Sequence, residues 1–225
     1  MTVRPIYVND GRKSFNKELS AMDKIRNILK NHPDTKFNLL PTLIYTYKDI
    51  PANTQISSSF ERLRIKYFLG TQYELLARLA NHLNENLEVG VTFDPRGKIA
   101  RTIYGEGATA KKSTKSHVFD YLDVDFINAS ADLKAIFMHL KMPVSLFHIT
   151  KPIEYQRMCD MGLKNVADAT WFCHNPIMGM TCGCCNPCRD ALHEGMAWRV
   201  SKIGHILGLT RAIPTIFRNK ILHKY

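Results

Sequence analysis

Four cysteines near the C-terminal end constrain this chain more than any other feature. Eight, two and two residues separate consecutive members of the set Cys173, Cys182, Cys185 and Cys188. Thiolates at Cys-x2-Cys spacing reach one metal ion, and four of them close a tetrahedral zinc site with no position left for a substrate water. Gly183 suits the tight turn of such a knuckle, because glycine adopts positive φ without steric cost. The spacing therefore predicts a structural zinc site in loop 173–188.

Two other uses of these cysteines stay open. The last three match the first part of a ferredoxin-type run, which would bind an iron–sulfur cluster, but that run needs another cysteine soon afterwards, where Leu192 and His193 stand. Disulfides fit less well, because closely spaced neighbours pair poorly and no secretory signal is recognisable. A fifth thiol, Cys184, lies inside the knuckle and is an alternative ligand. The pattern favours zinc over a cluster, and a cluster over disulfides.

Composition is that of a soluble globular chain the size of one domain. The 225 residues are 45% apolar and 23% charged, which is enough to bury a full core. Neither a bilayer-spanning apolar run nor a signal peptide is recognisable, so we expect a cytoplasmic protein with no membrane partner. Unpaired thiols agree with a reducing compartment. A net charge of +11 favours anionic partners.

Alternating hydrophobic patterns predict an α/β protein built on a parallel sheet with helices on both faces. Strands are expected at residues 6–8, 87–93 and 144–149, with a broken extended stretch at 36–45, interrupted by Pro41. Helices are expected at 16–29 with Asn16 as cap, 69–83, 130–140 capped by Ser130, 152–161 closed by Gly162, and 192–207. Residues 94–127 break the rhythm and are predicted to be an irregular insertion. Within them, GEGATAKKSTK (residues 105–115) is interpreted as a solvated basic loop rather than a phosphate cradle.

The C-terminal half resembles the 7-cyano-7-deazaguanine synthases, enzymes of the deazapurine (queuosine precursor) pathway. The likeness is carried by the strand VSLFHI, a lysine early in the next helix (Lys151 in ITKPIEY), the turn DATWFC and the Cys-x8-Cys-x2-Cys-x2-Cys intervals. Upstream, VRPIYVNDGRKSFNKELSAM keeps a strand, Gly11, Arg12 and a Glu-Leu pair, but not the family's Tyr-Gly-Gln turn. The likeness covers about residues 3–30 and 65–200, and it is most specific at the cysteines.

The resemblance implies a Rossmann-like (adenine nucleotide alpha hydrolase-like) fold with a parallel sheet and a C-terminal zinc loop and helix. One α/β domain would span residues 1–208, followed by a basic tail at 209–225. The implied reaction is the ATP-dependent conversion of 7-carboxy-7-deazaguanine and ammonia to the nitrile, with zinc in a structural role. Ligands of open α/β sheets bind at the carboxyl ends of the strands. Residues expected there are Lys151 as the catalytic candidate, Asp10, Arg12 and Thr170 as cofactor-binding candidates, and also Asn9 and Thr92.

One element of the family pattern is not found. The family's first strand ends in a Ser-Gly-Gly-x-Asp-Ser loop that cradles the phosphates of ATP with backbone N–H groups. This sequence contains no such loop, and residues 1–8 align best with the family's second strand. Three explanations stay open: the loop is encoded upstream, a partner chain supplies it, or the protein is a non-catalytic zinc-stabilised relative that binds nucleotide or nucleic acid.

The C-terminal end, from Arg199 onward, carries much of the excess of basic over acidic residues. From Arg199 onward the sequence has no acidic residue, and its basic residues are Arg199, Lys202, Arg211, Arg218, Lys220 and Lys224. Such a segment contacts nucleic acid in some proteins and faces solvent or an oligomer partner in others. Charge alone leaves a nucleic-acid contact and a homo-oligomer both open.

Overall fold

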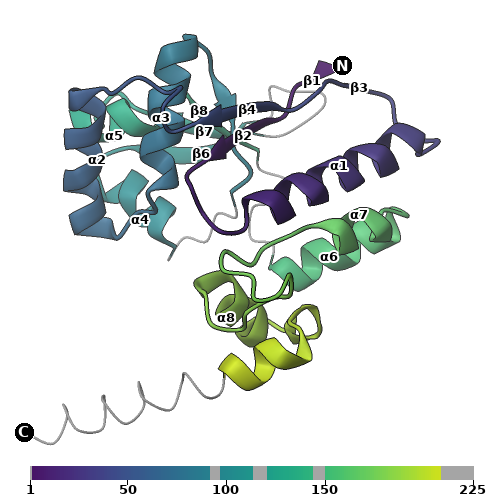
Figure 1. Cartoon of the computed structure of the whole chain (residues 1–225). Coiled ribbons are helices and arrows are strands. Elements are labelled where there is room, and N and C mark those ends of the chain that lie inside the picture. Colours follow the sequence, from purple (N-terminus) through teal and green to yellow (C-terminus); the bar gives the residue numbers. More distant parts are fainter. Residues whose placement is uncertain (1, 92–96, 114–120, 144–149, 209–225) are drawn as a thin grey trace, which may run out of the picture. The chain divides into compact units, whose positions relative to one another are not determined.

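The computed structural model describes residues 2–91, 97–113, 121–143 and 150–208 (Figure 1). These residues form a mixed α/β structure, as predicted, and divide into two compact units. Unit 1 comprises Met1–Ile44 and Thr150–Tyr225, and unit 2 comprises Tyr45–Ile149. The single domain over residues 1–208 and its Rossmann-like layering stay predictions.

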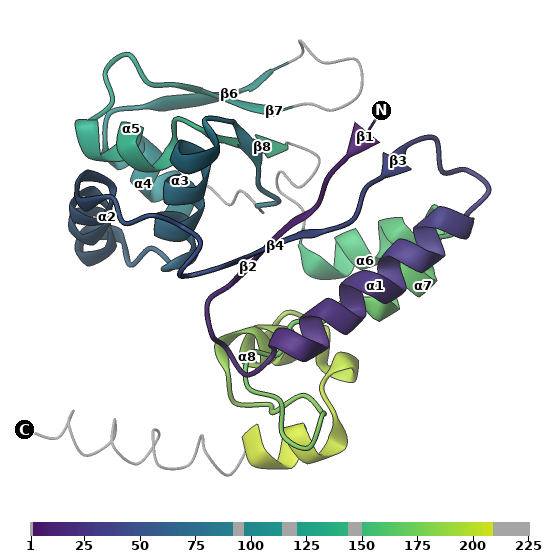
Figure 2. The same ribbon diagram turned by 45° about the horizontal axis from the view of Figure 1, so that its top comes forward.

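Within the described residues, unit 1 is mostly helical, and its short strands lie near its N-terminal end. Its elements are β1 (Thr2–Val3), β2 (Ile6–Asn9), α1 (Phe15–Asn31), β3 (Asn38–Leu39), α6 (Lys151–Asp160), α7 (Lys164–Ala169), α8 (Asn186–His193), the 3-10 turn Ala197–Arg199 and a helical segment over 202–208. Strand β1 pairs with β3 in parallel, and β2 pairs with β4 (Leu43–Thr46), which begins in this unit. Helix α1 packs on α7, and α7 on α6, so the three lie side by side in both ribbon views (Figures 1 and 2).

The described part of unit 2 combines four helices with a four-stranded sheet. Its elements are α2 (Thr54–Tyr67), α3 (Gln72–Leu83), β5 (Leu87–Glu88), α4 (Lys98–Gly105), β6 (Thr109–Ser113), β7 (Tyr121–Asp125), α5 (Ala131–Phe137) and β8 (Leu140–Pro143). The strand order is β5-β8-β7-β6; β5 pairs with β8 in parallel, and the other two pairs are antiparallel. Helix α2 packs against α3, α4 and α5. Their shared core includes Leu63, Leu79, Ile103, Leu133 and Phe137, each at most 1% exposed.

Several predicted elements are confirmed. The strand at residues 6–8 is β2, and the helix at 69–83 is α3. Pro41 does separate two short strands, β3 and β4. The Ser130 hydroxyl accepts a hydrogen bond from the Leu133 N–H (3.1 Å), so this residue caps α5 as expected. The predicted strand over residues 144–149 lies outside the described residues.

Other predictions are wrong, and each error has a local cause. The first helix begins at Phe15 after Ser14, so Asn16 lies inside its first turn and does not cap it. Helix α5 stops at Phe137, and Leu140, which the periodicity placed on that helix, opens β8. The long last helix is broken into α8, a 3-10 turn and the segment 202–208, because Gly195 turns the chain with φ +80°.

The expected irregular insertion at 94–127 is also wrong. It contains α4 and the β6–β7 antiparallel pair, in which Thr109 faces Asp125 across the ladder. The basic segment 105–115, interpreted as a solvated loop, supplies the last residue of α4 and all of β6. These strands also make the sheet mixed rather than purely parallel. Among the described helices, none is both long and apolar enough to cross a bilayer.

Candidate metal centre

The four predicted cysteine ligands converge in unit 1. The Sγ atoms of Cys173, Cys182, Cys185 and Cys188 all lie within 4.8 Å of one another. Cys185 is half-buried, and the other three are buried. The Sγ atoms of Cys182 and Cys188 are 3.9 Å apart, as are those of Cys173 and Cys185. A tetrahedral ion with zinc–sulfur bonds of about 2.3 Å requires sulfurs about 3.8 Å apart, so the donor set fits one zinc-sized ion.

The geometry bears on the two alternatives for these thiols. All six cysteines are free, and a separation of 3.9 Å is far longer than a disulfide bond of about 2.0 Å. A four-iron cluster binds each cysteine to a different iron, which separates the sulfurs more widely than a single ion does. The cluster of four thiols therefore favours one ion over both alternatives.

Backbone N–H groups point at two of the sulfurs. The N–H of Cys182 donates to the Cys173 Sγ (3.3 Å), and the N–H groups of Cys184 and Cys185 donate to the Cys182 Sγ (3.4 and 3.3 Å). Gly183 makes this knuckle with φ +71°, as its position predicted. The Cys184 thiol instead donates to the Cys182 carbonyl oxygen (3.2 Å) and is not part of the four-sulfur group. The turn thus presents Cys182 as a thiolate acceptor.

Without a bound cation, burial and hydrogen bonds shift the pKa values of Cys173, Cys182 and Cys188 in different directions. Burial raises the pKa of Cys173 to about 11 and raises the pKa of Cys188 further. Burial also acts to raise the pKa of Cys182, but the N–H groups of Cys184 and Cys185 outweigh it, and this pKa falls to about 7. A cation at the centre would offset the cost of ionising the other buried sulfurs, because metal binding displaces thiol protons.

Close backbone packing seats the segment 202–208 on the knuckle. A Cβ on Gly183 would lie 1.7 Å from the Gly204 carbonyl oxygen, and one on Gly204 would lie 2.4 Å from the Thr181 carbonyl oxygen. The Ser201 N–H donates to the Thr181 hydroxyl (2.6 Å), and the Ser201 hydroxyl donates to the Thr181 carbonyl (2.9 Å). Only glycine at positions 183 and 204 permits this approach. The metal loop and the last described segment therefore form one packed piece.

Aromatic and basic side chains line the other side of the loop. Trp171 donates from Nε1 to the Cys173 carbonyl oxygen (2.7 Å). Arg199 donates to both the carbonyl and the hydroxyl oxygen of Thr170 (2.6 and 2.8 Å) and stacks over Phe172, with 5.1 Å from its Cζ to the ring centroid. Burial lowers the pKa of Arg199, but the guanidinium stays charged. Arg199 thus ties the chain after α8 to the chain before the first cysteine.

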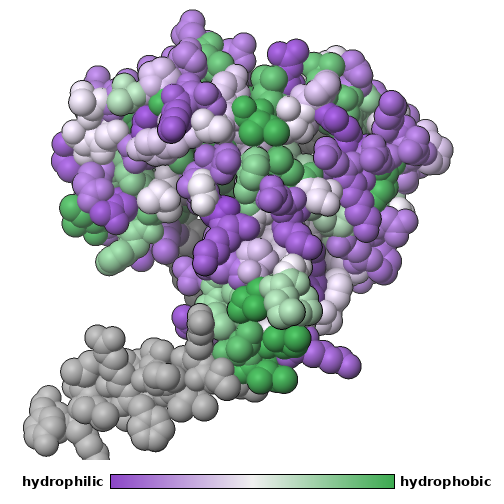
Figure 3. Space-filling view, in the orientation of Figure 1, coloured by the Kyte–Doolittle hydropathy of each residue, from purple (hydrophilic) through white to green (hydrophobic). Residues whose placement is uncertain are grey.

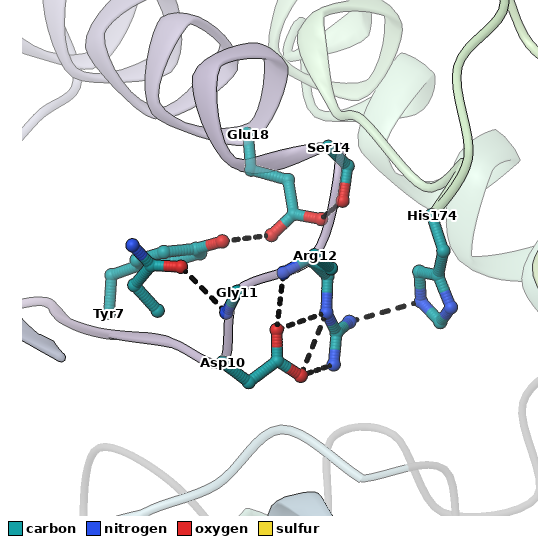
Figure 4. Close-up of polar contacts among 8 residues, drawn as sticks. Tyr7, Asp10, Gly11, Arg12, Ser14, Glu18 and His174 are labelled. Carbon is teal, nitrogen blue, oxygen red and sulfur yellow. Dashed lines mark hydrogen bonds and ion pairs between the residues drawn. The ribbon is translucent and has the colours of Figure 1, made fainter. Parts of the chain in front are cut away.

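The turn before α1 lies against the metal loop (Figure 4). Arg12 is paired with Asp10 through Nε at 2.7 and 2.9 Å and through Nη2, and its Nη1 lies 3.2 Å from Nε2 of His174. The hydrogen bond from Arg12 lowers the pKa of Asp10, and burial together with Arg12 lowers the pKa of His174. The structure therefore brings two of the predicted site residues to the metal loop.

A second carboxylate fixes the start of α1. Glu18 accepts hydrogen bonds from the Tyr7 hydroxyl (2.6 Å) and from the buried Ser14 hydroxyl (2.5 Å) (Figure 4). Burial and the Glu18 carboxylate raise the pKa of Tyr7. Asn9 accepts from the Gly11 N–H through Oδ1 (2.9 Å), so it shapes the turn. This arrangement links strand β2 to the helix that follows it.

The remaining predicted site residues have structural partners. Thr170 ends α7 and is held by Arg199, and Lys151 begins α6 and pairs with Glu194 at 2.9 Å. That pair accounts for a lysine at a helix start, where the helix dipole disfavours positive charge. Thr92 lies outside the described residues. The sequence analysis did not single out His174, and it counted Arg199 only among the basic residues near the C-terminal end. No local pattern indicates the contacts of His174 with Arg12 or of Arg199 with Thr170.

Comparison with protein-family models, curated proteins and solved structures finds no match. The fold and the site define a mixed α/β protein with a group of four cysteines that fits a structural zinc ion.

Proposed function

We propose that the four cysteines bind a structural zinc ion and that the protein belongs to deazapurine synthesis, as an enzyme of the 7-cyano-7-deazaguanine synthase type. The observation that carries the proposal is the convergence of four thiols within 4.8 Å. Their intervals are the ones through which the sequence resembles that family. A Rossmann-like arrangement of the strands and a cytoplasmic location belong to the same proposal.

The proposed chemistry starts from a carboxylate, which is a poor electrophile. Activation of 7-carboxy-7-deazaguanine with ATP supplies a leaving group, ammonia then gives the amide, and a second activation drives dehydration to the nitrile. The zinc ion would have no open coordination position and would stabilise the loop rather than touch substrate. A phosphate-binding Ser-Gly-Gly-x-Asp-Ser loop would have to come from a segment or chain beyond this sequence.

A second candidate is a non-catalytic zinc-stabilised relative that binds nucleotide or nucleic acid. The side-chain pairing of the candidate residues favours it. Asp10 binds Arg12, Thr170 binds Arg199, and Lys151 binds Glu194. Most of the basic residues that suggested nucleic acid, those from Arg211 onward, lie outside the described residues.

Metal analysis of the purified chain tests the site. We expect one zinc per chain, loss of that zinc in Cys188→Ser, and full zinc content in the matched controls Cys159→Ser and Cys184→Ser, whose thiols lie outside the four. Iron in place of zinc, or unchanged zinc in Cys188→Ser, would contradict the assignment.

An activity assay separates the two candidate functions. The chain is incubated with ATP, ammonia and 7-carboxy-7-deazaguanine, alone and with a co-expressed chain that carries the phosphate loop. The ligase function predicts amide and nitrile products by mass spectrometry in at least one of these mixtures. Binding of ATP or an oligonucleotide with no product in either mixture would favour the non-catalytic relative.

A further inference from the structure

The turn over residues 9–14 meets the metal loop through one arginine and one histidine. Arg12 Nη1 lies 3.2 Å from Nε2 of His174, which directly follows Cys173. A guanidinium only donates hydrogen bonds, so Nε2 must accept and the proton of a neutral imidazole must sit on Nδ1. Asp10 holds the guanidinium through Nε and Nη2. The Arg12 side chain is therefore held from two sides, and one side belongs to the metal loop (Figure 4).

A second contact ties α1 to the same loop. Lys17 Nζ lies 5.7 Å from the centroid of the Trp171 ring, at cation–π distance. Trp171 in turn donates to the Cys173 carbonyl oxygen at 2.7 Å. Trp171 and His174, on either side of Cys173 in the sequence, thus both contact residues at or near the start of α1. A change at the Cys173 sulfur reaches these contacts through one or two residues of chain.

We propose that metal binding at the four cysteines fixes the Arg12 guanidinium through His174, so that the metal centre sets the geometry of the turn over residues 9–14. The inference rests on the proposed metal site, and it is independent of the deazapurine chemistry. His174 acts as a positioning residue. Without the ion, the sulfurs contact one another only at thiol distances near 3.9 Å, and backbone N–H groups donate to two of them, Cys173 and Cys182. The loop that orients the imidazole then lacks the four bonds to one ion that would join all its sulfurs.

Hydrogen exchange of the zinc-loaded full chain tests the proposal. We expect His174→Ala to speed exchange of the Gly11 and Arg12 amides about fivefold, the lower end of typical coupling between sites, with zinc content unchanged. His174→Gln should restore slow exchange, because its amide oxygen accepts from Arg12. The control His193→Ala, on α8 beyond the last cysteine, should leave the turn unchanged.

Linkage supplies a reciprocal measurement. If the metal orders the turn, the ordered turn strengthens metal binding by the same factor. Competition with a chelator should therefore show zinc binding weakened about fivefold in Arg12→Ala but unchanged in Lys13→Ala, which removes an exposed positive charge next to it. Nitrogen chemical shifts of His174 should show the Nδ1-protonated tautomer in the wild-type chain and its loss in Arg12→Ala.

Three outcomes would overturn the proposal. Unchanged exchange of the turn in zinc-loaded His174→Ala would show that the histidine does not position Arg12. Equal zinc affinity in Arg12→Ala and Lys13→Ala would show that the turn and the metal are not coupled. A chain without stoichiometric metal would remove the metal site itself, and metal analysis before the exchange experiment separates that result from the other two.

Discussion

The two units bury different kinds of residue. Unit 2 encloses large aliphatic and aromatic side chains from four helices, and Leu79, Ile103, Leu133 and Phe137 have no exposed surface. In unit 1, helices α1 and α6 contain no buried residue. The residues described as fully enclosed there are Ser14, Cys173 and Cys188. One unit has the core of an ordinary small domain, whereas the other has a smaller core in which the most deeply buried residues include two thiols.

Because the two units bury different residues, we expect different interactions to stabilise them. Burial of a large apolar side chain contributes about 1.5–3 kcal/mol, so the unit 2 core stabilises itself. The unit 1 core is smaller. Besides three cysteines, its buried apolar residues are Val166, Ala167, Ala169, Ala191, Met196 and Val200, and Trp171 and Phe172 pack against it only partly buried. Apolar surface even remains exposed at the C-terminal end of the described residues, where the space-filling view is green (Figure 3), and Ile203 and Ile206 in that segment are 46% and 62% exposed. We therefore expect unit 1 to depend on the metal and unit 2 not to.

Metal removal should produce the largest difference in stability between the two units. Structural zinc contributes about 10–16 kcal/mol in zinc-finger peptides, so chelation or Cys182→Ser should unfold the region over residues 170–208. Amides of α2, α3 and α5 should keep their protection against hydrogen exchange, because their core contains no cysteine. Cys159→Ser serves as the control that alters a thiol outside the four. Simultaneous loss of protection in both units would show that they fold as one.

The reverse experiment targets the unit 2 core. Phe137 is fully buried, and its ring centroid lies 5.5 Å from that of Tyr73. Phe137→Ala should lower the free energy of unfolding of unit 2 by about 3–5 kcal/mol through lost burial and a cavity. Met138→Ala, at a side chain 52% exposed, should change it by less than about 0.5 kcal/mol. Denaturant unfolding measures both, and zinc content should stay at one per chain; loss of zinc in Phe137→Ala would contradict independent stabilities.

A single methyl group at the knuckle should have an intermediate effect. Gly183→Ala combines positive φ with a Cβ 1.7 Å from the Gly204 carbonyl oxygen, so it should cost about 2–4 kcal/mol from strain and overpacking. Gly162→Ala is the matched control, since it also has positive φ but an added Cβ there would meet only His32 Nε2, at an ordinary contact distance of 3.9 Å. That change should cost about 1 kcal/mol. Zinc affinity measured against a chelator should fall markedly in Gly183→Ala only. An equal fall in both variants would show that backbone strain, and not the close packing against Gly204, weakens zinc binding.

The four-cysteine group was more predictable from the sequence than the fold was. Spacing alone indicated that Cys173, Cys182, Cys185 and Cys188 lie together, and their Sγ atoms are within 4.8 Å of one another, because Cys-x2-Cys intervals bring sulfurs close through tight local turns. Gly183 was likewise readable, since its role depends on local φ. Contacts made over long sequence distances were not readable. Nothing in the residues around Arg12 indicates that a histidine 162 positions away completes its environment.

The prediction of secondary structure from the sequence was wrong or incomplete at several elements. Helix α2 was missed although Ile56, Phe60, Leu63 and Tyr67 follow helical spacing and Asn53 caps its start by accepting from the Ile56 N–H. Strand β6, with the sequence TAKKS, was also missed, because it lacks the alternating apolar pattern of a half-buried strand. Its backbone is held by the antiparallel ladder with β7, which the side chains of β6 do not indicate. The assignment of Lys151 to catalysis stays a prediction.

Substitution of Lys151 should have the smallest effect on stability, and it tests whether this lysine is needed for the proposed ligase activity. Its ion pair with Glu194 joins side chains that are 46% and 44% exposed, so Lys151→Met should change the stability of unit 1 by less than about 1 kcal/mol. Lys164→Met, which breaks a similarly exposed pair with Asp168, is the matched control for stability. If the ligase proposal holds, Lys151→Met should abolish product formation while Lys164→Met retains it, since only the first lysine matches the family's motif. Full activity in Lys151→Met would leave this lysine as an anchor between α6 and the end of α8, and catalysis would have to be sought at Asp10 and Arg12, beside the metal loop.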